Sequence, residues 1–230
     1  MIGIIGAMDI EVEFLKNSAE NKEIRTVSGI DFVKGEIYGK KVVIAKAGVG
    51  KVNAAVCAQT MALLYSPEVI INTGVAGSLS DEVGVGDIVI AEDTVQHDMD
   101  TSPLGDPVGF ISGINMVKLP CHKPTVTALL TAADEVGDIK YKKGTIASGD
   151  VFLNSTQIKK RIVENFGAIA GEMEGASIGQ VCIINNIPYC VVRAISDNAD
   201  GSSHMDYPEF VGIAAKKSAD LIMKYIKNYK

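Results

Sequence analysis

Short apolar runs alternate with segments of helical periodicity along most of the chain. Several runs, such as Val42-Val43-Ile44 and Val69-Ile70-Ile71, are apolar at every position. Continuous apolar runs are typical of strands in a sheet that helices cover on both faces. Strands are predicted over residues 2–7, 41–46, 68–72, 87–91, 143–148, 168–171 and 189–195.

The segments between these runs carry apolar residues at spacings of three and four, which predicts helices. They cover residues 11–16, 51–65, 125–136, 155–165, 175–185 and 207–227. Before the last of them, Asp206 is followed three residues later by Glu209, with Pro208 between them. This pattern is typical of a helix start, and it predicts that the helix begins after Asp206.

Residues 24–46 differ from the rest of the chain. Breaks at Ser28-Gly29 and Tyr38-Gly39 separate two or three strand-like runs, which predicts an antiparallel edge of the sheet. No linker, repeat or low-complexity stretch interrupts the alternation. The sequence therefore predicts a single α/β domain over residues 1–230, with three α/β/α layers around a twisted mixed central sheet.

Composition limits the kind of partner. Hydrophobic residues make up 47% and charged residues 22% of the chain, which excludes a disordered or fibrous protein. A net charge of −6 is a poor match for nucleic acid or anionic lipid. No apolar run approaches the roughly 18 residues that a membrane-spanning helix needs. The first residues lack the basic leader of a secretory signal, so no such signal is expected. Four cysteines without a C-x-x-C pair are typical of reduced thiols, so we expect a cytoplasmic protein with a small-molecule substrate.

Motifs for nucleotides and metals are incomplete. The segment Gly48-Val49-Gly50-Lys51-Val52-Asn53 follows a strand and opens a helix, but Asn53 stands where the dinucleotide motif has glycine, and the P-loop spacing is absent. Glycines that permit a tight turn explain this segment as well as ligand contact does. The three histidines have no metal-ligand spacing, so no metal is expected.

Acidic residues stand just past the ends of three predicted strands. Glu11 follows the first strand, Glu172 and Glu174 follow another, and Asp197 ends the run that contains Arg193. Ligands bind at the carboxyl edge of an open α/β sheet, and if the three strands are parallel neighbours their acids converge on one crevice. Each acid alone could be a first-turn residue, a solvated position or a cap. An arginine in an apolar strand needs a polar partner, however, and the cluster favours acid–base chemistry on a neutral or cationic ligand.

Five segments together resemble a known family. They are GIIGAMDIEVE at the start, NTGVAGSL at 72–79, SGDVFLN at 148–154, GEMEGAS at 171–177 and VVRAISDNAD at 191–200. In this order they resemble the 5′-methylthioadenosine/S-adenosylhomocysteine nucleosidases of the nucleoside phosphorylase superfamily. The resemblance implies a nucleoside phosphorylase-like fold and a cytoplasmic homodimer without metal or cofactor. It implies hydrolysis of the N-glycosidic bond of 5′-methylthioadenosine, S-adenosylhomocysteine and 5′-deoxyadenosine, which releases adenine and a 5-substituted ribose.

The resemblance also implies roles in catalysis. Asp197 is the general acid that protonates adenine N7, so its carboxyl must hold or relay a proton near neutral pH. Glu11 is the general base that activates water, with Arg193 nearby. Glu174 accepts hydrogen bonds from the ribose hydroxyls, and its charge opposes the positive charge that develops on the ring. Ser196 supports Asp197.

Other residues are implied to surround the substrate. Phe152 stacks on adenine, the backbone of Leu153 bonds to the purine edge, and Met173 lies under the ribose. The remaining substrate-binding residues are Ala76 and Gly77 beside the base, and Met8, Val49 and Tyr207 in an apolar slot for the 5′-thio group. For Met8 and Val49, packing in the core explains the residue equally well.

Two features depart from the family pattern. Val75 stands where many relatives have a serine that helps to hold the catalytic water. Residues 101–117 differ from the aromatic loop that completes the partner's 5′ pocket in relatives, and a long loop of this kind is typical of a lid, binding loop or interface. We expect a homodimer with loop 101–117 near the partner's pocket.

Other activities remain open at this point. A phosphate-dependent purine or uridine phosphorylase would need several cations for its nucleophile, and only Arg193 is plausibly placed. A 6-amino-6-deoxyfutalosine nucleosidase would use the same acids and differ in the 5′ pocket. A nucleoside-binding protein without turnover would keep the pocket and release no adenine. The biological role, whether methionine salvage, signal-precursor formation or detoxification, also stays open.

Overall fold

The computed structural model describes residues 1–137, 139–200 and 202–229, with the backbone alone for residues 204–206. The strands are β1 Ile2–Gly6, β2 Glu20–Val27, β3 Ile30–Ile37, β4 Lys40–Lys46, β5 Val69–Ser78, β6 Ile88–Gln96, β7 Leu119–Pro120, β8 Tyr141–Ser148, β9 Ala168–Glu172 and β10 Tyr189–Asp197. The helices are α1 Asp9–Ser18, α2 Lys51–Tyr65, α3 Lys123–Val136, α4 Thr156–Phe166, α5 Gly175–Ile184 and α6 Ser203–Asn228, with a short 3-10 turn, η1, at Ser102–Leu104.

Strand β5 is the point at which the sheet closes on itself. It pairs in parallel with β1 and β10, and its last residues pair with β9 in the antiparallel sense. Because β10 also pairs with β6, β6 with β8, and β8 with β9, these five strands form a closed ring. Strands β1, β4, β3 and β2 extend from the ring as an open sheet, and every residue of β5 is buried.

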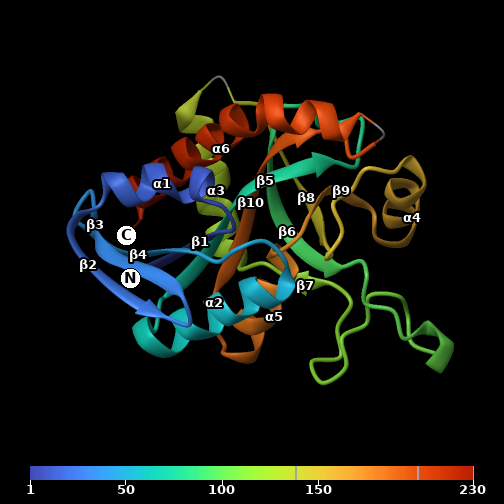
Figure 1. Ribbon diagram of the computed structural model, residues 1–230, viewed down its shortest axis with the longest axis horizontal. Helices are drawn as coiled ribbons and strands as arrows, with labels where there is room; N and C mark the ends of the chain where they lie inside the picture. Colours follow the sequence, from blue (N-terminus) through green and yellow to red (C-terminus); the bar gives the residue numbers. More distant parts are fainter. Residues whose placement is uncertain (138, 201, 230) are drawn as a thin grey trace.

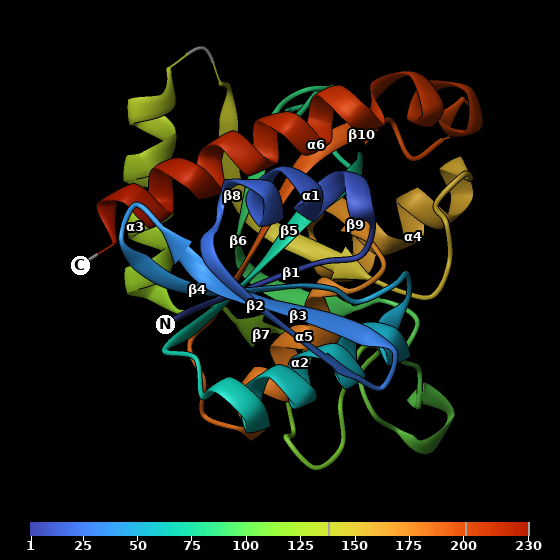
Figure 2. The same cartoon turned by 60° about the vertical axis from the view of Figure 1, so that its left-hand side comes forward.

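Helices cover the sheet on two sides, which confirms the predicted α/β class with a mixed central sheet. Helices α1, α3 and α6 pack together on one side, and α2 packs with α5 on the other (Figures 1 and 2). Helix α4 lies beside β8 and β9. In the described residues, no helix is both long enough and apolar enough to cross a bilayer.

The antiparallel edge is confirmed at the two predicted breaks. Strands β2, β3 and β4 pair antiparallel in sequence order. Both residues of each break have positive φ, 54° and 74° at Ser28-Gly29 and 51° and 71° at Tyr38-Gly39. Two successive positive φ angles give a tight turn whose twist matches that of the flanking strands of a β-hairpin. Glycine adopts such angles readily, which is why it stands second at both breaks.

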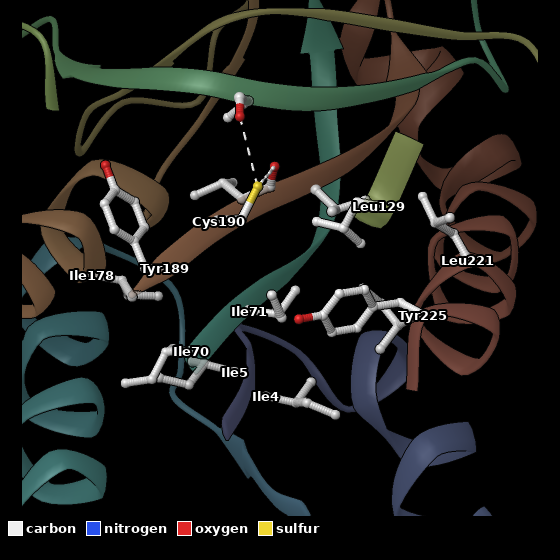
Figure 3. Packing of buried hydrophobic residues seen from close by; sticks show 14 of the residues in the cluster. Ile4, Ile5, Ile70, Ile71, Leu129, Ile178, Tyr189, Cys190, Leu221 and Tyr225 are labelled. Carbon is white, nitrogen blue, oxygen red and sulfur yellow. Dashed lines mark hydrogen bonds between the residues drawn. The ribbon is translucent and has the colours of Figure 1, made fainter. Parts of the chain in front are cut away.

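The core fills the space between the sheet and its helices. Ile4, Ile71, Leu129 and Tyr225 are among the buried side chains that meet between β1, β5, α3 and α6 (Figure 3). Burial of each such side chain contributes roughly 1.5–3 kcal/mol. All four cysteines are buried and unpaired, in agreement with the expected core thiols.

Several predicted boundaries are wrong, and strand β6, for example, runs to Gln96 rather than to residue 91. β5 continues from Asn72, where the apolar run stops, to Ser78. Helix α6 begins at Ser203, so Pro208 lies inside it rather than at its start. The earlier start follows from Asp200, whose Oδ1 accepts from the Ser202 amide at 2.8 Å and whose amide donates to Ser203 Oγ at 2.9 Å. The side chain of Asp206, the predicted cap, lies outside the described part of the chain.

Candidate active site

A cavity of about 180 Å³ lies where β1, β5, β9 and β10 end. Four carboxylates and no lysine, arginine or histidine are among its lining residues. Apolar side chains make up most of the remaining wall. The lining residues are Ala7, Met8, Glu11, Val49, Val75, Ala76, Gly77, Val151, Phe152, Leu153, Gly171, Glu172, Met173, Glu174, Ser196, Asp197 and Tyr207.

The acids converge, although not by the arrangement that the sequence suggested. Strands β1 and β10 are not neighbours, because each pairs with one side of β5. Strand β9 runs antiparallel to β5, and the two strands meet at their C-terminal ends, Gly77 opposite Gly171. The carboxyl ends of all four strands therefore reach the same cavity.

Glu11 is held by backbone amides from two segments. It lies in the first turn of α1, and its Oε2 accepts from the amides of Ala7 at 2.7 Å and Met8 at 3.0 Å. Its Oε1 accepts from the Val75 amide of β5 at 3.0 Å. The side chain is buried, and burial raises the pKa of this carboxyl, while Arg193 and the three amides oppose the rise.

Gly74 makes room for this arrangement. A Cβ at this position would lie 2.2 Å from Arg193 Nη1 and 2.4 Å from Glu11 Oε1. Real Cβ atoms do not approach other atoms so closely. The missing side chain therefore lets the carboxylate of α1 and the guanidinium of β10 lie against the same point of β5.

Asp197 ends β10 and is also buried. Its Oδ2 accepts from Ser196 Oγ at 2.9 Å, and its Oδ1 accepts from the Ala199 amide at 2.9 Å. A Cβ at Gly77 would lie 3.0 Å from Asp197 Oδ1, so this carboxylate packs against β5 two residues beyond the amide that holds Glu11. Two residues of extended strand span roughly 6.6 Å.

Arg193 does not line the cavity but lies beneath it. The side chain is 1% exposed, and its Nη2 donates to Asn72 Oδ1 and to the carboxylate of Glu172. Glu172 also accepts from Ser148 Oγ and from the amides of Glu174 and Gly175. The alternative that Glu172 is a solvent-exposed residue is therefore wrong, because its side chain is buried and pairs with the buried Arg193.

Glu174 lies above this ion pair and faces the cavity. Its Oε2 is 3.5 Å from Arg193 Nη2, and its Oε1 accepts from the Gly50 amide at 2.9 Å. Burial, together with the nearby charges of Glu172 and Glu11, raises the pKa of Glu174 to about 7 against the opposing effects of Arg193 and the Gly50 amide. A nearly buried carboxyl that titrates near neutrality is typical of functional sites.

Aromatic and sulfur-bearing side chains form the outer wall. Phe152 and Tyr207 meet edge to face, with ring centroids 5.6 Å apart. The Tyr207 hydroxyl lies 3.3 Å from Met8 Sδ, and Phe152 remains 47% exposed. A half-exposed aromatic ring at the mouth of a cavity is a surface on which a planar ligand can stack.

The structure brings most of the predicted site residues together. Arg193 is the one that lies behind the wall, and Val49 and Met8 both line the cavity, although Met8 also packs against the core. None of residues 101–117 lines the cavity within the single chain. The described residues include no group of three His, Cys, Asp or Glu side chains that could hold a metal. Lining residues that carried no predicted role are Ala7, Val151, Gly171 and Glu172.

Known proteins share this fold and this length. The family model of the phosphorylase superfamily matches residues 1–227. The 5′-methylthioadenosine/S-adenosylhomocysteine nucleosidases of Shewanella halifaxensis and Bacillus subtilis are 39% and 36% identical over 227 residues, and each alignment covers 98% of both chains.

Two solved structures are similar in the same way. The nucleosidase of the same name from Neisseria meningitidis, in complex with methylthio-immucillin-A, has a TM-score of 0.95 at 33% identity over 98% of both chains. The futalosine hydrolase of Helicobacter pylori has a TM-score of 0.93 at 34% identity, covering 98% of this chain and 96% of its own.

The chain therefore belongs to the phosphorylase superfamily and, within it, to the family of 5′-methylthioadenosine/S-adenosylhomocysteine nucleosidases. Proteins of that name are N-glycosyl hydrolases, and the prediction of an enzyme of this class is confirmed.

Proposed function

We propose that the chain hydrolyses the N-glycosidic bond of 5′-methylthioadenosine and S-adenosylhomocysteine, and also that of 5′-deoxyadenosine. The products are adenine and the 5-substituted ribose. The observation that carries this proposal is that two buried carboxylates, Glu11 and Asp197, line the same cavity. They contact β5 at Val75 and at Gly77, two residues apart. Because both carboxylates line one cavity, an acid and a water activator can meet the same nucleoside.

Asp197 is the proposed general acid. It gives a proton to adenine N7 as the bond from C1′ to the base breaks, so that adenine leaves as a neutral molecule rather than an anion. The hydrogen bonds from Ser196 Oγ and the Ala199 amide fix the direction of the carboxyl group. General acid catalysis of this kind contributes roughly 10²–10⁴-fold.

Glu11 is the proposed general base. It takes a proton from the water whose oxygen bonds to C1′, and proton exchange with solvent restores both carboxyl groups. Its raised pKa supports this role, because a base is more effective when its pKa lies closer to the working pH. The Val75 side chain offers no hydroxyl for the water, so Glu11 and nearby backbone groups are left to hold it.

Glu174 is the proposed ribose anchor. One of its oxygens is bonded to the Gly50 amide, which leaves acceptor capacity for the ribose hydroxyls. Its negative charge opposes the positive charge that develops on the ring as the base departs. The exposed ring of Phe152 and the backbone of Leu153 would receive adenine, and Met173 would lie under the ribose. Met8, Val49 and Tyr207 would surround the 5′ group.

The lining of the cavity argues against a phosphorylase. Phosphate needs cations or a nest of amides, but Arg193 is buried and paired with Glu172. The four carboxylates of the lining would repel the anion. A 6-amino-6-deoxyfutalosine nucleosidase remains the second candidate, because a futalosine hydrolase is among the similar structures and the acids would serve both reactions.

One assay tests the proposal. Adenine release is measured with 5′-methylthioadenosine, S-adenosylhomocysteine, 5′-deoxyadenosine and 6-amino-6-deoxyfutalosine in phosphate-free buffer. We expect release without phosphate, with the highest kcat/KM for the thio-substituted nucleosides. Dependence on added phosphate would overturn the proposal, and a highest kcat/KM for the futalosine substrate would favour the second candidate.

We also propose that the enzyme is a cytoplasmic homodimer that acts in methionine salvage. Val49, Val52 and Val56 are exposed at the start of α2, and Leu104 is 83% exposed at η1. These side chains support an interface that includes loop 101–117, which extends from the body in Figure 1 and would reach the partner's pocket. The four buried thiols are typical of a reducing compartment. Sedimentation at micromolar concentration tests the dimer, and a monomer would contradict it.

A further inference from the structure

Three loops beside the cavity are joined by a closed ring of polar contacts. Lys51 Nζ donates to Asp98 Oδ1 at 2.6 Å, and Asp98 Oδ2 accepts from the Asp150 amide at 2.9 Å. Asp150 Oδ1 in turn accepts from the Lys51 amide at 2.7 Å, which closes the ring. We call Lys51, Asp98 and Asp150 the polar clasp. None of the three lines the cavity.

The clasp lies next to two groups of the site. The Lys51 amide held by Asp150 directly follows the Gly50 amide, which donates to Glu174 Oε1. These are two consecutive amides at the start of α2, where backbone N–H groups have no partner within the helix and attract anions. Asp150 is also followed by Val151 and Phe152, which form part of the cavity wall.

The local backbone allows little freedom for these amides. Gly50 has a φ of 99°, a conformation that residues with a Cβ rarely adopt, and a Cβ there would lie 3.1 Å from Asp150 Oδ1. The ion pair of the clasp is partly buried, with Lys51 18% and Asp98 25% exposed. The bonds from Lys51 and from the Asp150 amide hold the pKa of Asp98 below its usual value against the effect of burial. Asp98 is thus charged at neutral pH.

We propose that the polar clasp is a positioning unit that sets the place of the Glu174 carboxylate and of the wall around Phe152. It acts through the Gly50 amide on one side and through the chain from Asp150 to Phe152 on the other. The inference rests on the proposed function, because it takes Glu174 as the group that meets the ribose. The clasp makes α2 part of the site although no side chain of the helix itself lines the cavity.

Substitutions in the clasp test this role. Asp150→Ala removes the acceptor of the Lys51 amide, and Asp150→Asn keeps an oxygen in that place. We expect Asp150→Ala to lower kcat/KM by roughly 10- to 100-fold, since displacing a group of the site by about 1 Å can cost about 10²-fold. Asp150→Asn should recover most of the loss. Lys34→Met, which removes the exposed pair with Glu23 on the β2–β3 hairpin, is the matched control and should leave kcat/KM unchanged.

A double-mutant cycle with Glu174→Gln separates positioning from a general effect on folding. If the clasp acts through Glu174, Asp150→Ala should cost much less in the Glu174→Gln background than in the wild type. Equal losses in the two backgrounds would overturn the assignment of Glu174 as a group that the clasp positions, and an Asp150→Asn variant as impaired as Asp150→Ala would overturn the proposal as a whole. Failure of the proposed function has a different signature, because the wild-type enzyme itself would then release no adenine from 5′-methylthioadenosine in phosphate-free buffer.

Discussion

Gly74 offers the sharpest test of how the site is built. Gly74→Ala adds one methyl group 2.2 Å from Arg193 Nη1 and 2.4 Å from Glu11 Oε1. To reach 3.4 Å, where ordinary contact begins, the two atoms would have to withdraw by about 1.2 and 1.0 Å. Neither is the free end of a flexible chain, because Glu11 is held by three amides and Arg193 by Asn72 and Glu172.

The expected loss follows from this displacement. A shift of about 1 Å in a catalytic group can cost about 10²-fold, which corresponds to about 2.7 kcal/mol in the barrier. Overpacking a buried position also lowers the free energy of unfolding, typically by about 1–3 kcal/mol. We therefore expect Gly74→Ala to fold with a lower melting temperature and to lose at least about 10²-fold in kcat/KM for 5′-methylthioadenosine.

The assay is adenine release below the melting transition of the variant, in phosphate-free buffer. Gly84→Ala is the matched control, because a Cβ at Gly84 has only one neighbour, Asp87 Oδ2 at 3.8 Å. This control should retain wild-type kcat/KM. A Gly74→Ala enzyme with kcat/KM within about threefold of wild type would refute the assignment of Glu11 to the reaction, since a displaced general base is expected to cost far more.

Three further changes test the other acids. Asp197→Asn should lower kcat by roughly 10²–10⁴-fold, because the amide cannot deliver a proton, and wild-type turnover would remove Asp197 from its role. Glu174→Gln should lower kcat more than it raises KM and should abolish a rise in kcat/KM with pH near 7, where the wild-type carboxyl, with its pKa of about 7, gains its charge. The pKa of Glu174 is raised in the folded state, so above pH 4.5 the carboxyl ionises more readily in the unfolded state, and the stability of the wild type falls as pH rises toward 7. Glu174→Gln lacks this carboxyl, so its melting temperature relative to that of the wild type should rise from pH 5 to pH 8. Glu172→Gln leaves Arg193 with a weakened buried partner and should cost about 3–5 kcal/mol in denaturant unfolding, whereas a loss below about 1 kcal/mol would mean that Glu174 and Asn72 suffice to hold the guanidinium.

The sequence predicts the elements better than it predicts how they join. The hairpins at Ser28-Gly29 and Tyr38-Gly39 can be predicted from the sequence because turn geometry depends on those residues alone. The continuation of β5 through Gly74 and Gly77 cannot be predicted in this way, because glycines after an apolar run are typical of a loop. Here they are required by side chains from α1 and β10, which become neighbours only in the folded chain.

The ring of five strands could not be predicted from the sequence for the same reason. It depends on the pairing of Gly77 with Gly171, which are far apart in the sequence and carry no side chain that could indicate a partner. The acids Glu11 and Asp197 are recognisable because they stand in specific motifs. Glu172 is harder to recognise, since an acid on either side of Met173 is also the pattern of a surface strand, and only the burial of Arg193 beside it assigns its role.

Strand β5 also has a consequence for attempts to change what the enzyme accepts. It supports Glu11 through Val75 and packs against Asp197 at Gly77, so a library of substitutions in this strand would disturb the proposed proton donor and the proposed water activator at once. Met8, Val49 and Tyr207, which are proposed to surround the 5′ group, line the same cavity without that double duty. Redesign toward bulkier thioethers should therefore diversify Met8, Val49 and Tyr207 and leave the strand untouched.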